Sequence, residues 1–407
     1  MLNLDQNFKL RIYSFFSFLF LFTIFIHNIV IFKNFNFIKI SELVFIPFFI
    51  IYLLFDYKKI ITNFSNIDLI LFSWPILNFV QYFFNSDNLY GVLSSIYIFG
   101  IYILFKNIFL DLGTKKIIKY LIITLIFSSI LSIIGWSTSQ FNIDLNLTEY
   151  KEGWPIYIIE RYRSQSLFPT PNMLFFYLSF GFLIIQNFNF KNKNIILFII
   201  LLGIFFTLSK SLIIFFPLIF ATYIFKYGKR FYRNIFIIIF LLLFIISNFS
   251  TNFIIAPKKI SFFKEHKNTN YMMSESIALY DNNLFTIYKS NYAELKIKSF
   301  RLIKDNFLLG IGFDNFRNFP MEKFDDIQGL KPHSSIIGLI VENGFIGIII
   351  FFLFFKNIIS MTLQKNEFFF LPVLTFALIE SINMDIHYFK IIWIFIPMIL
   401  MSGSSKI

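Results

Sequence analysis

The sequence predicts an all-α polytopic membrane protein with about twelve transmembrane helices. Three observations lead to this prediction: 57% of the 407 residues are hydrophobic, only 14% are charged, and the mean hydropathy is +0.71. A soluble protein carries about 25% charged residues, so too few charges are present here to cover a soluble globule of this size. Helices are the expected spanning elements, because lipid cannot satisfy the hydrogen bonds of an exposed backbone.

Apolar runs of the length needed to cross about 30 Å of hydrocarbon recur along the chain. The candidate spans lie at 10–32, 37–55, 67–84, 89–108, 117–136, 171–187, 194–209, 211–225, 234–249, 334–355, 367–384 and 388–402. The first run is too long for the core of a signal peptide and has no small-residue cleavage site, so we expect it to be retained. The segment 1–407 is therefore predicted to form a single membrane domain.

Lys and Arg are concentrated in alternate short segments between the runs, and such segments face the cytoplasm. Examples are Lys58-Lys59, Lys115-Lys116 and the segment 226–233. This pattern predicts that both termini are cytoplasmic and that two long loops, 137–170 and 250–332, lie on the opposite side. The larger loop contains a predicted amphipathic helix near 293–304, followed by a glycine turn.

Several classes of chemistry are excluded or disfavoured. The chain has no cysteine, which excludes disulfides, thiolate metal sites and cysteine nucleophiles. It has no phosphate-binding Walker motif, no dinucleotide glycine fingerprint and no Asp-x-Asp pair, so we predict neither a metal nor a cofactor. The net charge of +13 is explained by membrane topology, anionic lipid or an anionic substrate, and we expect no nucleic acid.

Of the four histidines, His333 has the position best suited to catalysis. It lies where the larger loop meets the span 334–355, and an imidazole with a pKa of about 6.5 suits a general base near neutral pH. His27 lies inside the first run, His266 lies among charged residues and His387 lies at the edge of a span. Hydrogen-bonding, solvated or interfacial roles are more typical of such positions.

Two cations lie on the side opposite the cytoplasm, against the general charge bias: Arg163 near the end of the loop 137–170, and Lys210 in a tight turn between two spans. One interpretation is that both side chains extend to lipid headgroups. Together with His333, they also fit a binding site for a phosphorylated lipid, since Arg holds phosphate bidentately and Lys acts as a point charge.

The stretch that begins at His333 resembles the signature of bacterial O-antigen ligases. That signature is a His, then Asn, Ser or Gln, nine residues, a Gly, two residues and another small residue. Here it is His333-Ser334, nine residues, Gly344, two residues and Gly347. The match also opens a span after a long outer loop, which is the position that the family requires.

Three further segments are similar to family motifs and follow in the same order. The segment 306–316 is similar to the family's Pro-x-x-Gly-x-Gly-x-x-x-Phe turn. The stretch 163–172 is similar to its Arg-x-x-Gly-x-x-x-x-Pro-Asn segment, and 207–211 is similar to its Thr-x-Ser-Arg pattern. The resemblance covers 163–347. The departures from the family pattern are Phe307 for Pro, Ser166 for Gly and Lys210 for Arg.

The resemblance implies a GT-C-like membrane glycosyltransferase of the bacterial inner membrane, with both long loops periplasmic. The donor would be a glycan on undecaprenyl diphosphate, and the acceptor of a ligase would be the lipid A-core, with membrane lipids as the surrounding partner. A polymerase of the same superfamily would instead join lipid-linked repeats. Transfer would be inverting and independent of metal.

The resemblance also implies roles for particular residues. His333 would be the general base. Arg163 and Lys210 would stabilise the leaving diphosphate. Either Lys289 or Arg301 would substitute for a family arginine in the large loop, and Arg301 could add a further contact to the substrate. Asp314 and Glu342 would support His333 by orienting it.

Two alternatives remain open at this stage. A flippase or transporter of lipid-linked glycans also fits twelve spans and a basic cavity, although no internal repeat is visible in the sequence. A membrane scaffold without chemistry fits as well, but it leaves the ordered neighbours of His333 unexplained.

Overall fold

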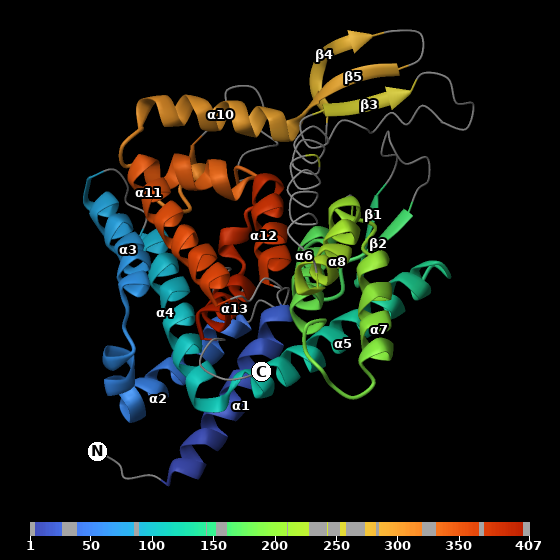
Figure 1. The fold of residues 1–407 in the computed structure, drawn as a ribbon. Helices are drawn as coiled ribbons and strands as arrows, with labels where there is room; N and C mark the ends of the chain where they lie inside the picture. Colours follow the sequence, from blue (N-terminus) through green and yellow to red (C-terminus); the bar gives the residue numbers. More distant parts are fainter. Residues whose placement is uncertain are drawn as a thin grey trace.

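The computed structural model describes residues 5–26, 39–84, 89–143, 145–151, 161–209, 211–227, 242, 253–257, 273–281, 285–319, 331–365 and 370–401. Long α-helices dominate this part of the chain (Figure 1). The helices of the first half are α1 (Gln6–Phe25), α2 (Ile40–Thr62), α3 (Asn66–Phe84), α4 (Leu89–Leu112), α5 (Thr114–Ser139), α6 (Pro171–Ile185), α7 (Lys193–Phe205) and α8 (Leu212–Tyr227). Those of the second half are α10 (Asn291–Asp305), α11 (Ser335–Gln364), α12 (Leu371–Asn383) and α13 (Lys390–Met401).

Six helices of the described chain are long and apolar enough to cross a membrane: α1 to α5 and α11. Four shorter apolar helices, α6, α7, α12 and α13, occupy other predicted spans. A polytopic helical membrane protein is thus supported, whereas the predicted count of twelve spans is not confirmed. The predicted span at 234–249 lies outside the described residues, apart from position 242.

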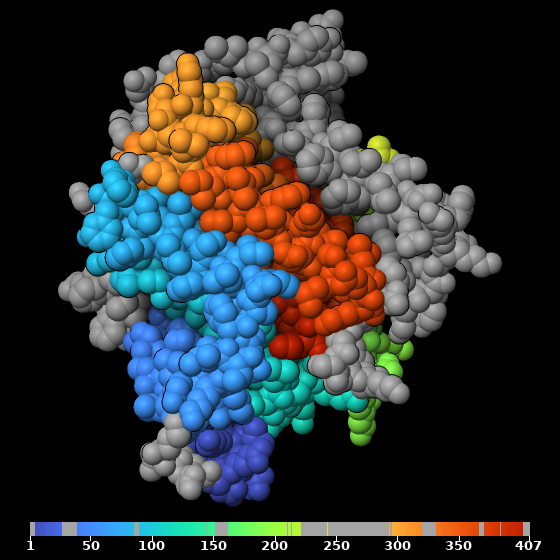
Figure 2. Space-filling view, turned by 60° about the vertical axis from the view of Figure 1, so that its left-hand side comes forward, coloured from blue at the N-terminus to red at the C-terminus, as the bar shows by residue number. Residues whose placement is uncertain are grey.

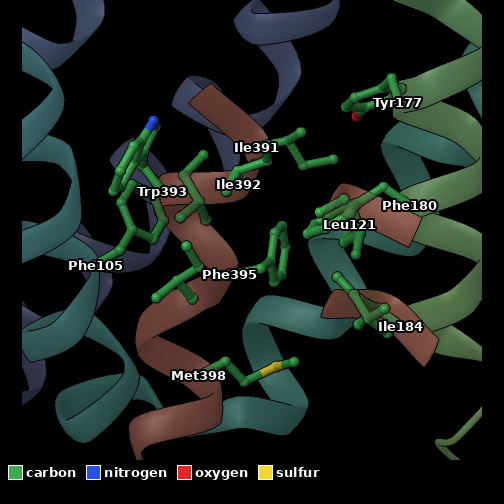
Figure 3. Close-up of a cluster of buried hydrophobic side chains, with 14 of the residues drawn as sticks. Phe105, Leu121, Tyr177, Phe180, Ile184, Ile391, Ile392, Trp393, Phe395 and Met398 are labelled. Carbon is green, nitrogen blue, oxygen red and sulfur yellow. The ribbon is translucent and has the colours of Figure 1, made fainter. Parts of the chain in front are cut away.

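The centre of the bundle is packed with large apolar side chains contributed by helices that are distant in sequence. Trp393 and Phe395 of α13 are buried against neighbours that include Phe105 of α4 (Figure 3). On the other side of α13, Leu121 of α5 and Phe180 of α6 continue the same cluster. Such aromatic packing holds together helices whose outer faces are also apolar.

Polar contacts inside the bundle join α3 to α4 and to α11. Asp68 of α3 is fully buried, forms an ion pair with Lys106 of α4 and accepts a 2.7 Å hydrogen bond from Tyr102. A buried charge of this kind is tolerated only when it is paired and hydrogen-bonded. Asn343 of α11 accepts a hydrogen bond from Trp74 at 3.2 Å and donates one to Asn78 at 2.6 Å. These contacts fix the part of α11 that follows the predicted site.

The two predicted outer loops contain short strands that the sequence analysis did not predict. In the first loop, β1 (Thr148–Lys151) pairs antiparallel with β2 (Arg161–Ser164), so that Glu149 lies opposite Arg163. In the second, a three-stranded antiparallel sheet has the order β3-β5-β4, with β3 at Phe253–Pro257, β4 at Met273–Asp281 and β5 at Phe285–Ser290. The fold is therefore mainly helical rather than entirely so.

The amphipathic helix predicted near 293–304 corresponds to α10. Figure 1 shows α10 lying across one end of the bundle, above α11, with the three-stranded sheet beside it. Figure 2 shows the same helix, in orange, resting on the end of α11. Leu295 of α10 is buried together with Ile311 and Val341, because its apolar face packs on the start of α11. This end of the bundle contains His333.

Candidate functional site

His333 is held in an unusual backbone conformation by a carboxylate from a distant segment. Its φ of +52° falls in the left-handed region, which few residues other than glycine adopt. The carboxylate of Asp385, between α12 and a short 3₁₀ helix at Ile386–Tyr388, accepts hydrogen bonds from the backbone N–H groups of His333 and Ser334, each at 3.2 Å. Such strained positions persist only when surrounding contacts hold them, and they are frequent at functional sites.

The start of α11 is joined to the end of α12 by further hydrogen bonds. Ser334 is the N-cap of α11, and its hydroxyl lies 3.3 Å from the carbonyl oxygen of Ser381. The hydroxyl of Ser335 donates to the carbonyl of Met384 at 2.9 Å and accepts from the backbone N–H of His387 at 3.2 Å. The loop before α11 is therefore positioned by the C-terminal helices.

The electrostatic surroundings favour the neutral form of the His333 imidazole. Burial lowers its pKa below the usual 6.5, and the positive charges of Lys296 and Lys331 act in the same direction. The Asp385 carboxylate opposes this shift. Burial in turn raises the pKa of Asp385, against the influence of His333 and Lys331. A neutral imidazole near pH 7 is the form that accepts a proton.

The two glycine motifs seen in the sequence are in direct contact. The N–H groups of Ile311 and Gly312 donate to the carbonyls of Val341 and Glu342, each at 2.9 Å. Gly310 packs so closely on α11 that a Cβ there would lie 2.6 Å from backbone atoms of Glu342 and Gly344. The spacing of the glycines thus allows the loop after α10 to pack against the backbone of α11.

Asp314 and Glu342 lie in this region and contact Lys331 and Tyr388. Asp314 forms an ion pair with Lys331 at 3.1 Å. Glu342 accepts a 2.9 Å hydrogen bond from the Tyr388 hydroxyl, and the Lys331 ammonium lies 3.1 Å from the centre of the Tyr388 ring. These contacts do not involve His333, so the orienting roles predicted for both carboxylates stay predictions. The carboxylate that binds the backbone of His333 is that of Asp385.

Arg163 is brought together with the turn that precedes Lys210. Its Nε donates to the carbonyl of Thr207 at 3.1 Å, and one terminal nitrogen donates to Asn172 at 2.8 Å. The hydroxyl of Ser209 lies 3.3 Å from the same Asn172 oxygen. Two segments that resemble family motifs in the sequence, 163–172 and 207–211, are therefore neighbours in space. Lys210 itself lies outside the described residues.

Burial and a nearby carboxylate shape the environment of Arg163. Only 9% of its side chain is exposed, and a terminal nitrogen lies 3.9 Å from Glu149, its partner across β1 and β2. The guanidinium is therefore held in a fixed orientation rather than extended into lipid headgroups, the alternative interpretation from the sequence.

Helix α12 lies between the His333 and Arg163 regions, because it packs on α6, α8 and α11. Ser381 contacts Ser334, next to His333. The preceding residue, Glu380, is fully buried near Ser211, in the turn after Lys210. Consecutive residues of one helix thus contact both regions.

Arg301, one of the two candidates for the family's loop arginine, is exposed on α10. The α10 cation that influences His333 is Lys296, whose own pKa is lowered by burial. The sequence analysis missed it, although Lys296 lies beside Leu295 and three residues before Ser299, both of which are buried.

Sequence reasoning also missed Asp385, Lys331 and Tyr388. The signal for Asp385 was available, since it is one of two carboxylates in the apolar stretch 370–401. Within the described ranges, no group of three His, Asp or Glu side chains is arranged to hold a metal ion.

Comparison with known proteins identifies the region around this site. Residues 195–352 match the family model described as O-antigen ligase. The match covers less than half of the chain, and it includes His333 and both glycine motifs but not Arg163. No curated protein matches the chain significantly. Residues 195–352 are therefore similar to the O-antigen ligase family, which supports the superfamily that the sequence motifs resemble.

Proposed function

We propose that this protein transfers a glycan from undecaprenyl diphosphate to a sugar hydroxyl of the lipid A-core, at the periplasmic face of a bacterial inner membrane. The observation that carries the proposal is the position of His333, at the end of a helical bundle and inside the region that matches the O-antigen ligase family, where burial lowers the pKa of its imidazole. Asp385 holds its backbone in place. The charge bias of the short segments supports cytoplasmic termini and periplasmic loops.

The proposed reaction is a single inverting displacement. The acceptor hydroxyl attacks the anomeric carbon, a new carbon–oxygen bond forms, and the bond from that carbon to the diphosphate oxygen breaks. His333 takes the proton of the hydroxyl, which makes a weak nucleophile effective. The leaving undecaprenyl diphosphate departs as an anion and needs no proton.

The negative charge that develops on the diphosphate requires fixed cations rather than a proton donor. Arg163 is suited to this role because contacts with Thr207 and Asn172 orient it before any substrate binds. Lys210, next to Ser209 in the sequence, would add a second positive charge. Removing one preorganised contact of this kind costs about 3 kcal/mol of transition-state stabilisation in comparable sites.

The test is His333→Ala in the purified full chain, reconstituted in lipid with undecaprenyl-diphosphate glycan and lipid A-core. We expect transfer to be lost while the thermal unfolding temperature stays close to that of the parent protein. His266→Ala serves as the matched control, since the sequence places His266 among Lys264, Glu265 and Lys267. Normal transfer by His333→Ala would contradict the assignment of the base.

The acceptor is tested separately in a strain that lacks the protein. Loss of every O-antigen band on the core supports a ligase. Survival of a core bearing one repeat indicates a polymerase, which uses the same chemistry on a different acceptor.

A further inference from the structure

A second group of cations lies close to His333 but has no part in the proposed displacement. Its members come from the start of α2, the start of α13, the loop after α10 and the segment before His333. We call it the α2–α13 cation cluster, and it consists of Lys39, Arg317, Lys331 and Lys390.

Lys390 and Lys39 are linked through one carboxylate. The ammonium of Lys390 lies 2.6 Å from Glu42 Oε1 and 2.5 Å from the hydroxyl of Ser41. The other oxygen of Glu42 accepts the backbone N–H of Lys39 at 3.0 Å. The starts of α2 and α13 are thereby held together, and both of these helix starts favour negative charge.

The second pair of cations shares the carboxylate of Asp314. Lys331 lies 3.1 Å from one of its oxygens, and Arg317 forms an ion pair with the other. Asp314 is almost completely buried, whereas the side chains of Lys331 and Arg317 are 33% and 41% exposed. The cations therefore remain accessible on the side away from their shared partner.

Tyrosine rings connect the two pairs. Arg317 lies over Tyr90 at 5.6 Å, and Lys390 lies over Tyr97 at 5.2 Å. These tyrosines are seven residues apart on α4, two helical turns that span about 10 Å on one face. The cluster thus places cations and aromatic rings within about 10 Å along α4. Lys331 and Arg317 are its more exposed cations, whereas the side chain of Lys390 is 13% exposed.

The lysines of the cluster are close enough to repel one another. Among the described residues, three of the four cations form ion pairs with Glu42 or Asp314, and Lys331 also interacts electrostatically with Glu342 and Asp385. Burial lowers the pKa of Lys39 to about 8, and the positive charges of Lys390 and Lys331 contribute to the shift. A bound anion would relieve this repulsion, because an opposite charge stabilises each protonated amine.

The cluster is also adjacent to the proposed base. Lys331 is two residues before His333 and affects its pKa. Tyr388 packs under the Lys331 ammonium and is two residues before Lys390. An anionic group held here would place the remainder of its sugar chain beside His333.

We propose that the α2–α13 cation cluster binds a phosphate or carboxylate substituent of the acceptor glycan. The inference rests on the proposed function and extends it, because it assigns an anionic class of acceptor and a location for it. Phospholipid headgroups carry the same chemistry, and the experiment below separates the two sources.

The first experiment measures transfer to two acceptors, a phosphorylated lipid A-core and the same material after phosphatase treatment. In Lys390→Gln, we expect the KM for the phosphorylated acceptor to rise about tenfold, as for loss of one charge-assisted contact. The KM for the treated acceptor should change less than twofold, and Lys390→Arg should restore the parent behaviour. Equal effects on both acceptors would overturn the proposal.

The matched control is Lys59→Gln. Lys59 is likewise ion-paired, to Asp111 at 2.5 Å, but it lies outside the cluster, at the other end of α2 from Lys39. It should change neither KM. Thermal unfolding of each variant in lipid nanodiscs establishes that the chain is folded.

A binding measurement distinguishes failure of this inference from failure of the proposed function. The phosphorylated core oligosaccharide is titrated into the full chain without donor, in nanodiscs of phosphatidylcholine. Binding that survives His333→Ala and weakens in Lys390→Gln supports the cluster even if no transfer is detected. If Lys390→Gln changes only the rise in unfolding temperature that phosphatidylglycerol nanodiscs produce, the cluster binds a lipid headgroup and the proposal is wrong.

Discussion

Substitution of Gly344 by alanine is expected to destabilise the junction between α11 and the loop after α10. Gly344 has φ +63° and ψ −164°, a region that essentially only glycine occupies. A Cβ at this position would lie 2.3 Å from the carbonyl oxygen of Leu308, which is backbone and cannot rotate away. The loop would therefore have to move away from α11.

The magnitude follows from two contributions. The backbone conformation costs about 1–3 kcal/mol for a residue with a side chain. Moving the loop also weakens the hydrogen bonds from Phe345 to Phe307, at 2.8 Å, and from Ile346 to Leu308, at 3.3 Å. At about 1 kcal/mol for each bond, the total is about 3–5 kcal/mol, a large part of the stability of a typical domain.

The chain offers a control that isolates the steric contribution. Gly113 has φ +76° and ψ 150°, a similar backbone region, but a Cβ there would meet nothing within 4 Å. We expect Gly113→Ala to lower the unfolding temperature modestly and Gly344→Ala to lower it by about 2 °C more, which is the shift that an extra 2 kcal/mol or so produces in a chain of this length. Thermal unfolding in nanodiscs measures both. Equal unfolding temperatures for the two variants would refute the reasoning.

Three further predictions concern titration and buried carboxylates. Because burial lowers the pKa of His333, the acid limb of kcat/KM should lie below pH 6.5, and an acid limb above pH 6.5 would contradict this prediction. The contribution of His333 to the free energy of unfolding should be complete above pH 6.5 and should decline as the pH falls towards the pKa of the folded state. Asp385→Asn should lower kcat about tenfold, because one hydrogen bond to the backbone of this turn is lost. It should also move the acid limb of the pH profile to lower pH, since the carboxylate raises the pKa of His333, and an unchanged pH profile would argue for a purely structural role. Glu380→Leu should raise the free energy of unfolding by about 1–3 kcal/mol, because the carboxylate is fully buried on an apolar helix, with the Ser211 hydroxyl beside it. A less stable variant would show that the buried carboxylate is compensated.

The sequence located most of the helices, because long apolar runs need only their length and composition to be recognised. The run predicted at 117–136 corresponds to α5 at Thr114–Ser139, and the amphipathic segment near 293–304 corresponds to α10. Strands β1 and β2 were missed, since neither has the alternation of apolar and polar residues that marks a strand. Their pairing depends on contacts across the loop rather than on local pattern.

The candidate site was only partly predictable, for a related reason. The glycine spacing in the sequence pointed to His333, and the structure gives that spacing a physical cause in the contact between Gly310 and Gly344. The partner of His333 is 52 residues further along the chain, at Asp385, and no local pattern connects them. Likewise, only the packing of α10 on α11 distinguishes Lys296 from the exposed Arg301.

The clamp formed by Asp385 implies that the family domain is not an autonomous module. The family match ends at residue 352, yet the carboxylate that fixes the backbone of His333 comes from beyond it. Before the match, Gln81 donates a 2.9 Å hydrogen bond to the carbonyl of Glu342. A fragment cut at the borders of the match would contain the proposed base without the carboxylate that holds its backbone, so the region that matches the family model is smaller than the unit that folds.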